Sequence, residues 1–199
     1  LESSTATGAG LVALILALGP VSGAHFNPVV TLADRVLGGI STRDGCVYAF
    51  AQVIGGCLGA MIANLMFGLS AVTLSTDTRS SGALWLGEVV ATFGLLMVIL
   101  GVVRAGRSSV AAYAVGGYIA AAYWFTSSTS FANPAVTIAR TLTDTFAGIR
   151  PSSAPMFVVM QFAGGLLAVG LARFWHPTLR TADLVEPEPA EPEPVDEVK

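Results

Sequence analysis

Two short repeats constrain the fold more strongly than any other feature of this sequence. Residues 22–33 and 128–139 align without a gap and share Ser, Asn, Pro, Val, Thr and Ala at equivalent positions. At the centre of the two copies lie two related tripeptides, Asn27-Pro28-Val29 and Asn133-Pro134-Ala135. Asn is a favourable N-cap, and Pro suits the first helical position, where no N–H group is needed. Each repeat therefore predicts the start of a helix.

The helices that follow these starts are expected to be short. The half-helices are expected at residues 28–35 and 134–140, and their apolar segments cover only residues 29–33 and 135–139. A helix needs about 20 residues to cross a bilayer. In a chain that is 53% hydrophobic and only 12% charged, two such half-helices suggest two positive helix ends that meet inside a membrane. We predict an all-α membrane protein whose remaining helices hold these ends in place.

Five longer apolar segments have the length of membrane spans. They occupy residues 5–21, 46–67, 83–103, 109–126 and 154–175. Gln52 and the glycines after it have a counterpart in Gln161 and its glycines, so the second span resembles the fifth. An odd number of spans between two copies turns one copy upside down relative to the other. We therefore expect an inverted repeat, with repeat 1 at about 1–70, repeat 2 at about 82–176, and the first membrane helix missing from repeat 1.

Arginine distribution gives the expected orientation of the membrane domain, residues 1–176. The larger group is Arg35, Arg43, Arg104, Arg107, Arg173 and Arg180, and the group on the opposite side is Arg79, Arg140 and Arg150. The positive-inside rule places the larger group, and with it the C-terminus, in the cytoplasm. The acidic segment 177–199, rich in Glu and Pro, is expected to be a disordered tail that either solubilises the chain or recruits a partner.

Other function classes lack their usual sequence signals. Cys46 and Cys57 have no metal-ligand spacing, so neither a metal site nor a disulfide is expected. No basic cluster suggests binding to nucleic acid, and no nucleophile–base pair or phosphate-binding loop is present in the sequence. We predict no enzymatic activity and no cofactor, with the lipid bilayer as the main partner.

The paired tripeptides, each inside a matching repeat and flanked by apolar spans, resemble those of the aquaporin (major intrinsic protein) family. The segment from Ser22 to Thr31 is similar to the family's first signature, and Glu88 and Thr92 have the Glu-x-x-x-Thr spacing that opens its second repeat. The resemblance covers residues 5 to about 175. It implies six spans, two half-helices, and a homotetramer in the cell (plasma or inner) membrane, with a pore through each subunit for passive flow of water or small uncharged solutes.

This resemblance also implies roles for individual residues. Asn27 and Asn133 cap the half-helices and turn N–H groups toward the solute, while the alternative for each is a plain helix cap. Pro28, Val29, Pro134 and Ala135 fix the direction of the half-helices. Extended backbone before each motif is expected to offer carbonyl groups to the lumen at Gly23, Ala24, His25, Phe26, Thr129, Phe131 and Ala132. For His25, the alternative is a loop histidine with a backbone partner.

Glu88 is an acidic residue inside an apolar span, a position that indicates function by default. A proton relay needs a chain of titratable neighbours, and the sequence offers none in the spans. The resemblance implies instead that Glu88, with Thr92 one turn away, supports the second half-helix loop through hydrogen bonds. Arg140 is expected to cap the C-terminal end of that half-helix.

The narrow selectivity filter departs from the family pattern. The family usually has Arg directly after the second Asn-Pro-Ala, where this chain has Val136. Carried over by spacing, the other filter positions fall on Thr7, Ala121 and Ser130. A ring of small, uncharged residues is wider and less polar, and leaves the exclusion of cations to the helix dipoles. We expect passage of solutes larger than water, such as glycerol-like polyols, urea-like amides or metalloid hydroxides including arsenous acid (arsenite).

Residues 130–137 and 144–149 are also similar to an aquaglyceroporin-like bacterial branch associated with arsenic resistance. Glycerol facilitators commonly have Asp where this chain has Thr137, which weakens the case for glycerol itself. Two alternatives stay open. A coupled secondary transporter also uses inverted repeats and broken helices, but it needs an ion site or a titratable pair in the spans. The second alternative is a truncated membrane protein that does not conduct.

Overall fold

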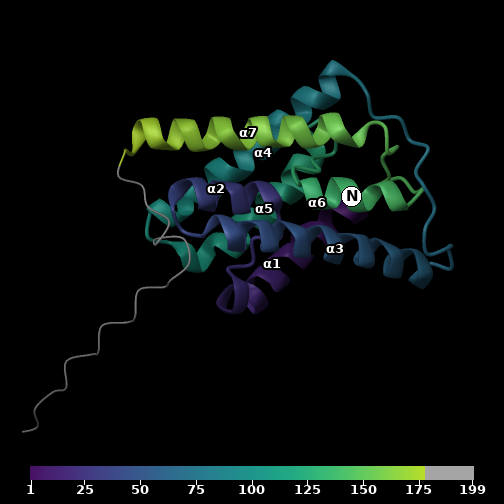
Figure 1. The fold of residues 1–199 in the computed structure, drawn as a ribbon, viewed down its shortest axis with the longest axis horizontal. Helices are drawn as coiled ribbons and strands as arrows, with labels where there is room; N and C mark the ends of the chain where they lie inside the picture. Colours follow the sequence, from purple (N-terminus) through teal and green to yellow (C-terminus); the bar gives the residue numbers. More distant parts are fainter. Residues whose placement is uncertain (178–199) are drawn as a thin grey trace, which may run out of the picture.

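The computed structural model describes residues 1–177 as an assembly of helices (Figure 1). Two short helices begin at the predicted tripeptides, α2 (Pro28–Leu37) and α6 (Pro134–Ala139). The longer helices are α1 (Glu2–Ser22), α3 (Thr42–Met66), α4 (Gly82–Arg104), α5 (Ala111–Phe125) and α7 (Ala154–Trp175). One-turn 3-10 helices are η1 (Ser108–Val110) and η2 (Arg140–Leu142). Residues 1–177 contain no strand, which confirms the predicted all-α class; apart from Pro177, the acidic tail lies outside these described residues.

Four helices of the described region are long and apolar enough to cross a membrane, namely α1, α3, α4 and α7. The fourth predicted span, 109–126, is shorter than expected. Its helix, α5, has 15 residues, because residues 108–110 form the separate turn η1 and α5 begins only after it. The predicted order of spans and half-helices is nevertheless kept.

Small residues determine how closely the long helices pack. On α7, a Cβ atom at Gly164 would collide with the backbone carbonyl of Val89 on α4. Between α1 and α5, a Cβ atom at Gly8 would lie 2.9 Å from the carbonyl oxygen of Gly116, and one at Gly116 would lie 2.6 Å from that of Gly8. Glycine at these positions therefore permits the close contact of α4 with α7 and of α1 with α5.

The half-helices α2 and α6 lie between α3 and α7, and their N-termini meet near the middle of the molecule (Figure 1). Gly165 of α7 packs against Val29 at the start of α2. In the corresponding place, a Cβ atom at Gly56 of α3 would lie 3.3 Å from the carbonyl oxygen of Ala135 at the start of α6. Equivalent glycines of the two halves thus receive the half-helix of the opposite half, as the predicted inverted repeat requires.

Candidate functional site

Asn27 and Asn133 occupy the N-cap positions of α2 and α6. The Oδ1 atom of Asn27 accepts a hydrogen bond from the backbone N–H of Val29 at 2.9 Å, and Oδ1 of Asn133 accepts one from Ala135 at 3.0 Å. Pro28 and Pro134 follow as the first helical residues, where their missing N–H is not needed. The local sequence thus starts both half-helices in the same way.

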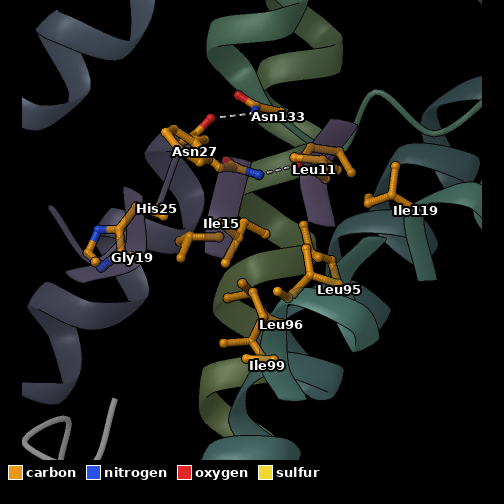
Figure 2. A pocket seen from close by; sticks show the side chains of 18 of the residues that line it. Leu11, Ile15, Gly19, His25, Asn27, Leu95, Leu96, Ile99, Ile119 and Asn133 are labelled. Atoms are coloured by element: carbon orange, nitrogen blue, oxygen red, sulfur yellow. Dashed lines mark hydrogen bonds between the residues drawn. The ribbon is translucent and has the colours of Figure 1, made fainter. Parts of the chain in front are cut away.

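The same two side chains join the halves to each other. The Nδ2 atom of Asn27 donates to the carbonyl oxygen of Ala132 at 2.7 Å, and Nδ2 of Asn133 donates to the carbonyl oxygen of Phe26 at 2.8 Å (Figure 2). An amide NH2 group has two N–H donors, so each Asn keeps one for a molecule beside it. The crossed hydrogen bonds fix the distance between the two positive helix ends.

The backbone before each half-helix differs from the extended conformation that we expected. Gly23, Ala24 and Phe26 have φ of 67°, 46° and 48° in the first loop. In the second loop, the residues with positive φ are Thr129 at 62°, Ser130 at 51° and Ala132 at 48°. Within residues 1–177, all non-glycine residues with positive φ belong to these two loops. Such strain persists only where surrounding contacts enforce it, and it concentrates at functional sites.

Glu88 supplies those contacts for the second loop. It is fully buried, and its carboxylate oxygens accept hydrogen bonds from the backbone N–H groups of Phe131 at 2.9 Å and Ala132 at 2.8 Å. Gln161 of α7 donates its Nε2 to Glu88 and also to the Thr137 hydroxyl, at 2.8 Å from the latter. Glu88 is therefore an acceptor inside a packed network and holds the loop in its strained shape.

Thr92 is buried beside this network, on the turn of α4 after Glu88, but its Oγ1 atom has no hydrogen-bond partner among the described residues. In the first half, Gln52 of α3 donates Nε2 to the Thr31 hydroxyl at 3.0 Å, as Gln161 does to Thr137. The glutamines of the two repeats thus bind the equivalent threonines of the two half-helices.

A cavity of about 680 Å³ passes both half-helix N-termini. Its walls carry the two Asn side chains and a broad apolar surface from α1, α4 and α5. Figure 2 shows this surface below the asparagines, formed by Leu11, Ile15, Leu95, Leu96, Ile99 and Ile119. Polar groups are thus concentrated at few places along an apolar wall, an arrangement suited to small molecules with few hydrogen-bonding groups.

We define the inner end of the cavity as the end lined by His25, Asp34 and Ser108. The Nδ1 atom of His25 lies 3.1 Å from the Thr31 hydroxyl, and Nε2 lies 3.7 Å from a carboxylate oxygen of Asp34. The partners of His25 are therefore side chains, in contrast to the backbone partner of our alternative interpretation. The hydrogen-bond contact of Nδ1 holds the ring at the cavity wall, whereas the separation between Nε2 and Asp34 is longer than a hydrogen bond.

We define the outer end as the end lined by Thr7, Tyr123 and Arg140. The Thr7 hydroxyl lies 3.1 Å from the Tyr123 hydroxyl, which accepts a hydrogen bond from Nη2 of Arg140 at 2.8 Å. Arg140 occupies the C-cap position of α6 through its backbone, but its side chain does not bind the helix carbonyls as expected. It lies instead over the Phe131 ring, 4.3 Å from the ring centroid.

The structure places one of the four predicted filter residues, Ala121, away from the cavity. Ala121 is exposed on α5 and does not line the cavity, whereas Tyr123 does. Residues two positions apart on a helix, such as Ala121 and Tyr123, point roughly 200° apart, so their side chains cannot both face the cavity. Tyr123 continues the stripe of α5 residues Ala112, Val115 and Ile119 that line the cavity, and this helical spacing was the signal for it.

Most other predicted pore residues do lie at the cavity. Those that line it are Thr7, Gly23, Ala24, His25, Phe26, Asn27, Ser130, Phe131, Ala132, Asn133 and Val136. Thr129 does not, and Pro28, Val29, Pro134 and Ala135 are buried behind the wall. Ser130 is 2% exposed, and its Oγ atom has no hydrogen-bond partner among the described residues.

Sequence reasoning gave no role to Arg79, which is nearly buried near the outer end. Its side chain donates to the carbonyl oxygens of Gly148 at 2.8 Å and Phe146 at 3.0 Å, and forms an ion pair with Asp77 at 3.0 Å. It thereby joins the loop before α4 to the loop before α7. A lone arginine in a polar loop carries no sequence signal for such a role.

Comparison with known proteins agrees with this geometry. The family model described as "Major intrinsic protein" matches residues 1–130 and 107–191. The chain is 49% identical over 172 residues to the aquaglyceroporin AqpS of Rhizobium meliloti (strain 1021), which covers 86% of this chain and 73% of that protein.

More distant relatives carry related names. Aquaporin NIP1-4 of Oryza sativa subsp. japonica is 32% identical, with 81% of this chain and 60% of that protein covered. The probable aquaporin AqpM of Archaeoglobus fulgidus is 31% identical, with 82% and 72% covered. The chain therefore belongs to the major intrinsic protein family, and is a multi-pass membrane channel protein for water and small solutes rather than an enzyme.

Proposed function

We propose that this chain is a passive channel for small uncharged solutes larger than water, with water itself also passing. The observation that carries the proposal is the cavity that runs past the N-termini of both half-helices and both Asn side chains. A positive end on each half-helix repels cations at the centre of the path. Asn27 and Asn133 each keep an N–H donor for the oxygen of a neutral solute.

The filter residues favour solutes with both carbon and oxygen surfaces. Val136 stands where the family usually has Arg, and it brings no charge to that position. The unpartnered Ser130 hydroxyl and the Thr7 hydroxyl provide hydrogen bonds, while the Tyr123 ring provides apolar contact. Glycerol-like polyols, urea-like amides and undissociated metalloid hydroxides such as arsenous acid fit this chemistry. The name of the 49% identical relative, an aquaglyceroporin, supports the same size class.

The assembly and orientation are proposals of the same kind. We propose a homotetramer in the cell membrane with the C-terminus in the cytoplasm. The larger arginine group, which includes Arg35 and Arg104, supports this orientation. Large apolar side chains on the outer faces of the helices, such as Phe50, Ile62 and Leu167, are exposed in the single chain and suit contact with lipid or with neighbouring subunits.

Stopped-flow light scattering of proteoliposomes tests the proposal. Vesicles that contain the full chain are mixed with glycerol, urea or arsenous acid, and their swelling is compared with that of protein-free vesicles. We expect flux above the lipid background, linear in solute concentration and independent of a proton gradient. Saturable flux that depends on the proton gradient supports the coupled transporter instead. Flux equal to the background for every solute and for water means that the chain is not a channel.

A further inference from the structure

Arg140 brings a guanidinium group to the outer end of the cavity, although Val136 occupies the usual filter position. Arg140 follows Val136 by about one helical turn. It bonds to Tyr123 on α5 and stacks on Phe131 from the loop before α6. Val136, Tyr123, Phe131 and Arg140 all line the cavity, so the guanidinium is beside the path and not behind it.

The neighbouring Arg79 is a cation with a structural role, and its contacts differ from those of Arg140. Three backbone carbonyls and the Asp77 carboxylate engage its guanidinium, which also lies 5.1 Å from the centroid of the Phe131 ring. Unlike Arg140, Arg79 does not line the cavity. Burial is the largest cause that lowers the pKa of Arg79. The charge of Arg140 lowers this pKa as well, while Asp77 raises it. Arginine nevertheless stays protonated in proteins, so two positive charges lie near the outer end and only one of them is paired with a carboxylate.

Arg140 has more N–H donors than the one side-chain acceptor it binds in residues 1–177 can engage. A guanidinium carries five N–H groups, and the Tyr123 hydroxyl is the one side-chain acceptor that Arg140 binds among residues 1–177. No carboxylate of this range forms an ion pair with it. The Phe131 ring, itself buried, supports the guanidinium plane from one side. The group is therefore held in position, charged, and able to donate to an oxygen in the cavity.

We propose that Arg140 is a selectivity residue of this channel. It supplies from the next helical turn the positive charge that Val136 cannot supply. The proposal rests on the proposed function, because the cavity must be the path of the solute. Its charge repels cations at the outer end, and its free N–H groups bind hydroxyl or carbonyl oxygens of neutral solutes. Since the guanidinium lies beyond Val136, the space at Val136 stays open for solutes larger than water.

The test compares Arg140→Gln with Arg150→Gln in the full chain. Arg150 belongs to the same arginine group, but its side chain is exposed, donates to Thr78 and does not line the cavity. Both variants lose one positive charge. We expect the sodium and proton permeability of Arg140→Gln proteoliposomes to rise about tenfold, because the repulsion between unit charges at close range is removed. Arg150→Gln is expected to leak no more than the unchanged chain.

Two further variants make the result specific. Arg140→Lys keeps the charge and is expected to retain cation exclusion. Tyr123→Phe removes the hydroxyl that holds Arg140, and is expected to give a leak between those of the unchanged chain and Arg140→Gln. If Arg140→Gln does not yield folded protein, the cation leak of Tyr123→Phe is compared with that of the unchanged chain instead.

The outcomes separate the two proposals. Water and glycerol flux that persist in Arg140→Gln with no more cation leak than in Arg150→Gln overturn the role of Arg140. The same conclusion follows if Tyr123→Phe, as the substitute test, leaks no more than the unchanged chain. Absence of solute and water flux in the unchanged chain overturns the proposed function itself.

Discussion

The helices α3 and α7 are equivalent members of the two repeats, yet they are packed very differently. Gln52-x-x-Gly55-Gly56 in α3 matches Gln161-x-x-Gly164-Gly165 in α7. In α7 a stripe of residues is buried against α4, and a Cβ atom at Gly164 has no room. In α3 only Asn64 is buried, and a Cβ atom at Gly55 meets nothing within 4 Å among the described residues. The first glycine of the pair therefore permits close packing against a neighbouring long helix in the second half only.

The faces that receive the half-helices do not share this difference. Gly165 contacts Val29 and Gly56 lies beside Ala135, so both half-helices are seated on their glycine in the same way. What distinguishes the halves is the support behind the strained loops, since Glu88 holds the second loop through two backbone N–H groups. Both halves thus contribute an asparagine to the cavity in the same way, whereas the buried carboxylate that holds a strained loop belongs to the second half.

The largest expected effect comes from removing the acceptor in the second half. Glu88→Ala leaves two buried backbone N–H groups without their partner and removes one of the two hydrogen bonds of the Gln161 amide. We expect the free energy of unfolding to fall by about 3–5 kcal/mol. Thermal unfolding in detergent checks this, with the exposed Glu2→Ala as the control for loss of one acidic residue. Equal melting temperatures for the two variants contradict a supporting role for Glu88.

The glycine pair tests the packing difference directly. Gly164→Ala forces a methyl group against the Val89 carbonyl and is expected to cost about 1–3 kcal/mol through overpacking. Gly55→Ala places the same methyl group in open space and is expected to stabilise the helix by about 0.5–1 kcal/mol, because Ala loses less backbone entropy. Both are measured by thermal unfolding of the purified chain. Shifts of the same sign and size show that α3 and α7 are packed alike.

Val136 tests the width of the outer end. Val136→Arg adds a long side chain beside Thr7 and Tyr123, and is expected to reduce glycerol flux about tenfold more than water flux, equivalent to about 1.4 kcal/mol of additional barrier. Stopped-flow measurements of both fluxes on the same vesicles give the ratio. If both fluxes fall equally, Val136 does not set the width.

The glutamine pair is expected to show the smallest difference between two matched variants. Gln161→Leu removes hydrogen bonds to Glu88 and Thr137 and is expected to cost about 2 kcal/mol, whereas Gln52→Leu removes one bond to Thr31 and is expected to cost about 1 kcal/mol. The difference between the two melting temperatures measures how much the second half depends on its network. Equal losses of stability would mean that the two halves depend equally on the hydrogen bonds of their glutamines.

The sequence was sufficient to predict the helix starts and the class of the fold. Asn27 and Asn133 are followed by Pro, and this local chemistry determines the N-caps without help from the rest of the chain. Burial of Glu88 could also be predicted, because a carboxylate within an apolar helix needs donors. These features depend on neighbours in the sequence or on one strong physical requirement.

The remainder of the site depends on geometry that spacing does not carry. Spacing from the motifs puts Ala121 at the filter, but α5 ends at Phe125 and the backbone from there to Asn133 is irregular, with positive φ at three residues. Counting through such a loop does not preserve the face of the helix before it. The direction of the Arg140 side chain is likewise decided by Tyr123 and Phe131, which are distant in sequence.

One measurement tests most directly whether solutes pass through this cavity. In a chain with Cys46→Ser and Cys57→Ser, Val136→Cys places the remaining thiol at the cavity wall, and Ala121→Cys places it on the exposed face of α5. A water-soluble thiol reagent is added to proteoliposomes during glycerol and water flux. We expect the reagent to stop flux through Val136→Cys and to leave flux through Ala121→Cys unchanged. Undiminished flux through fully labelled Val136→Cys would contradict a path between the two half-helices.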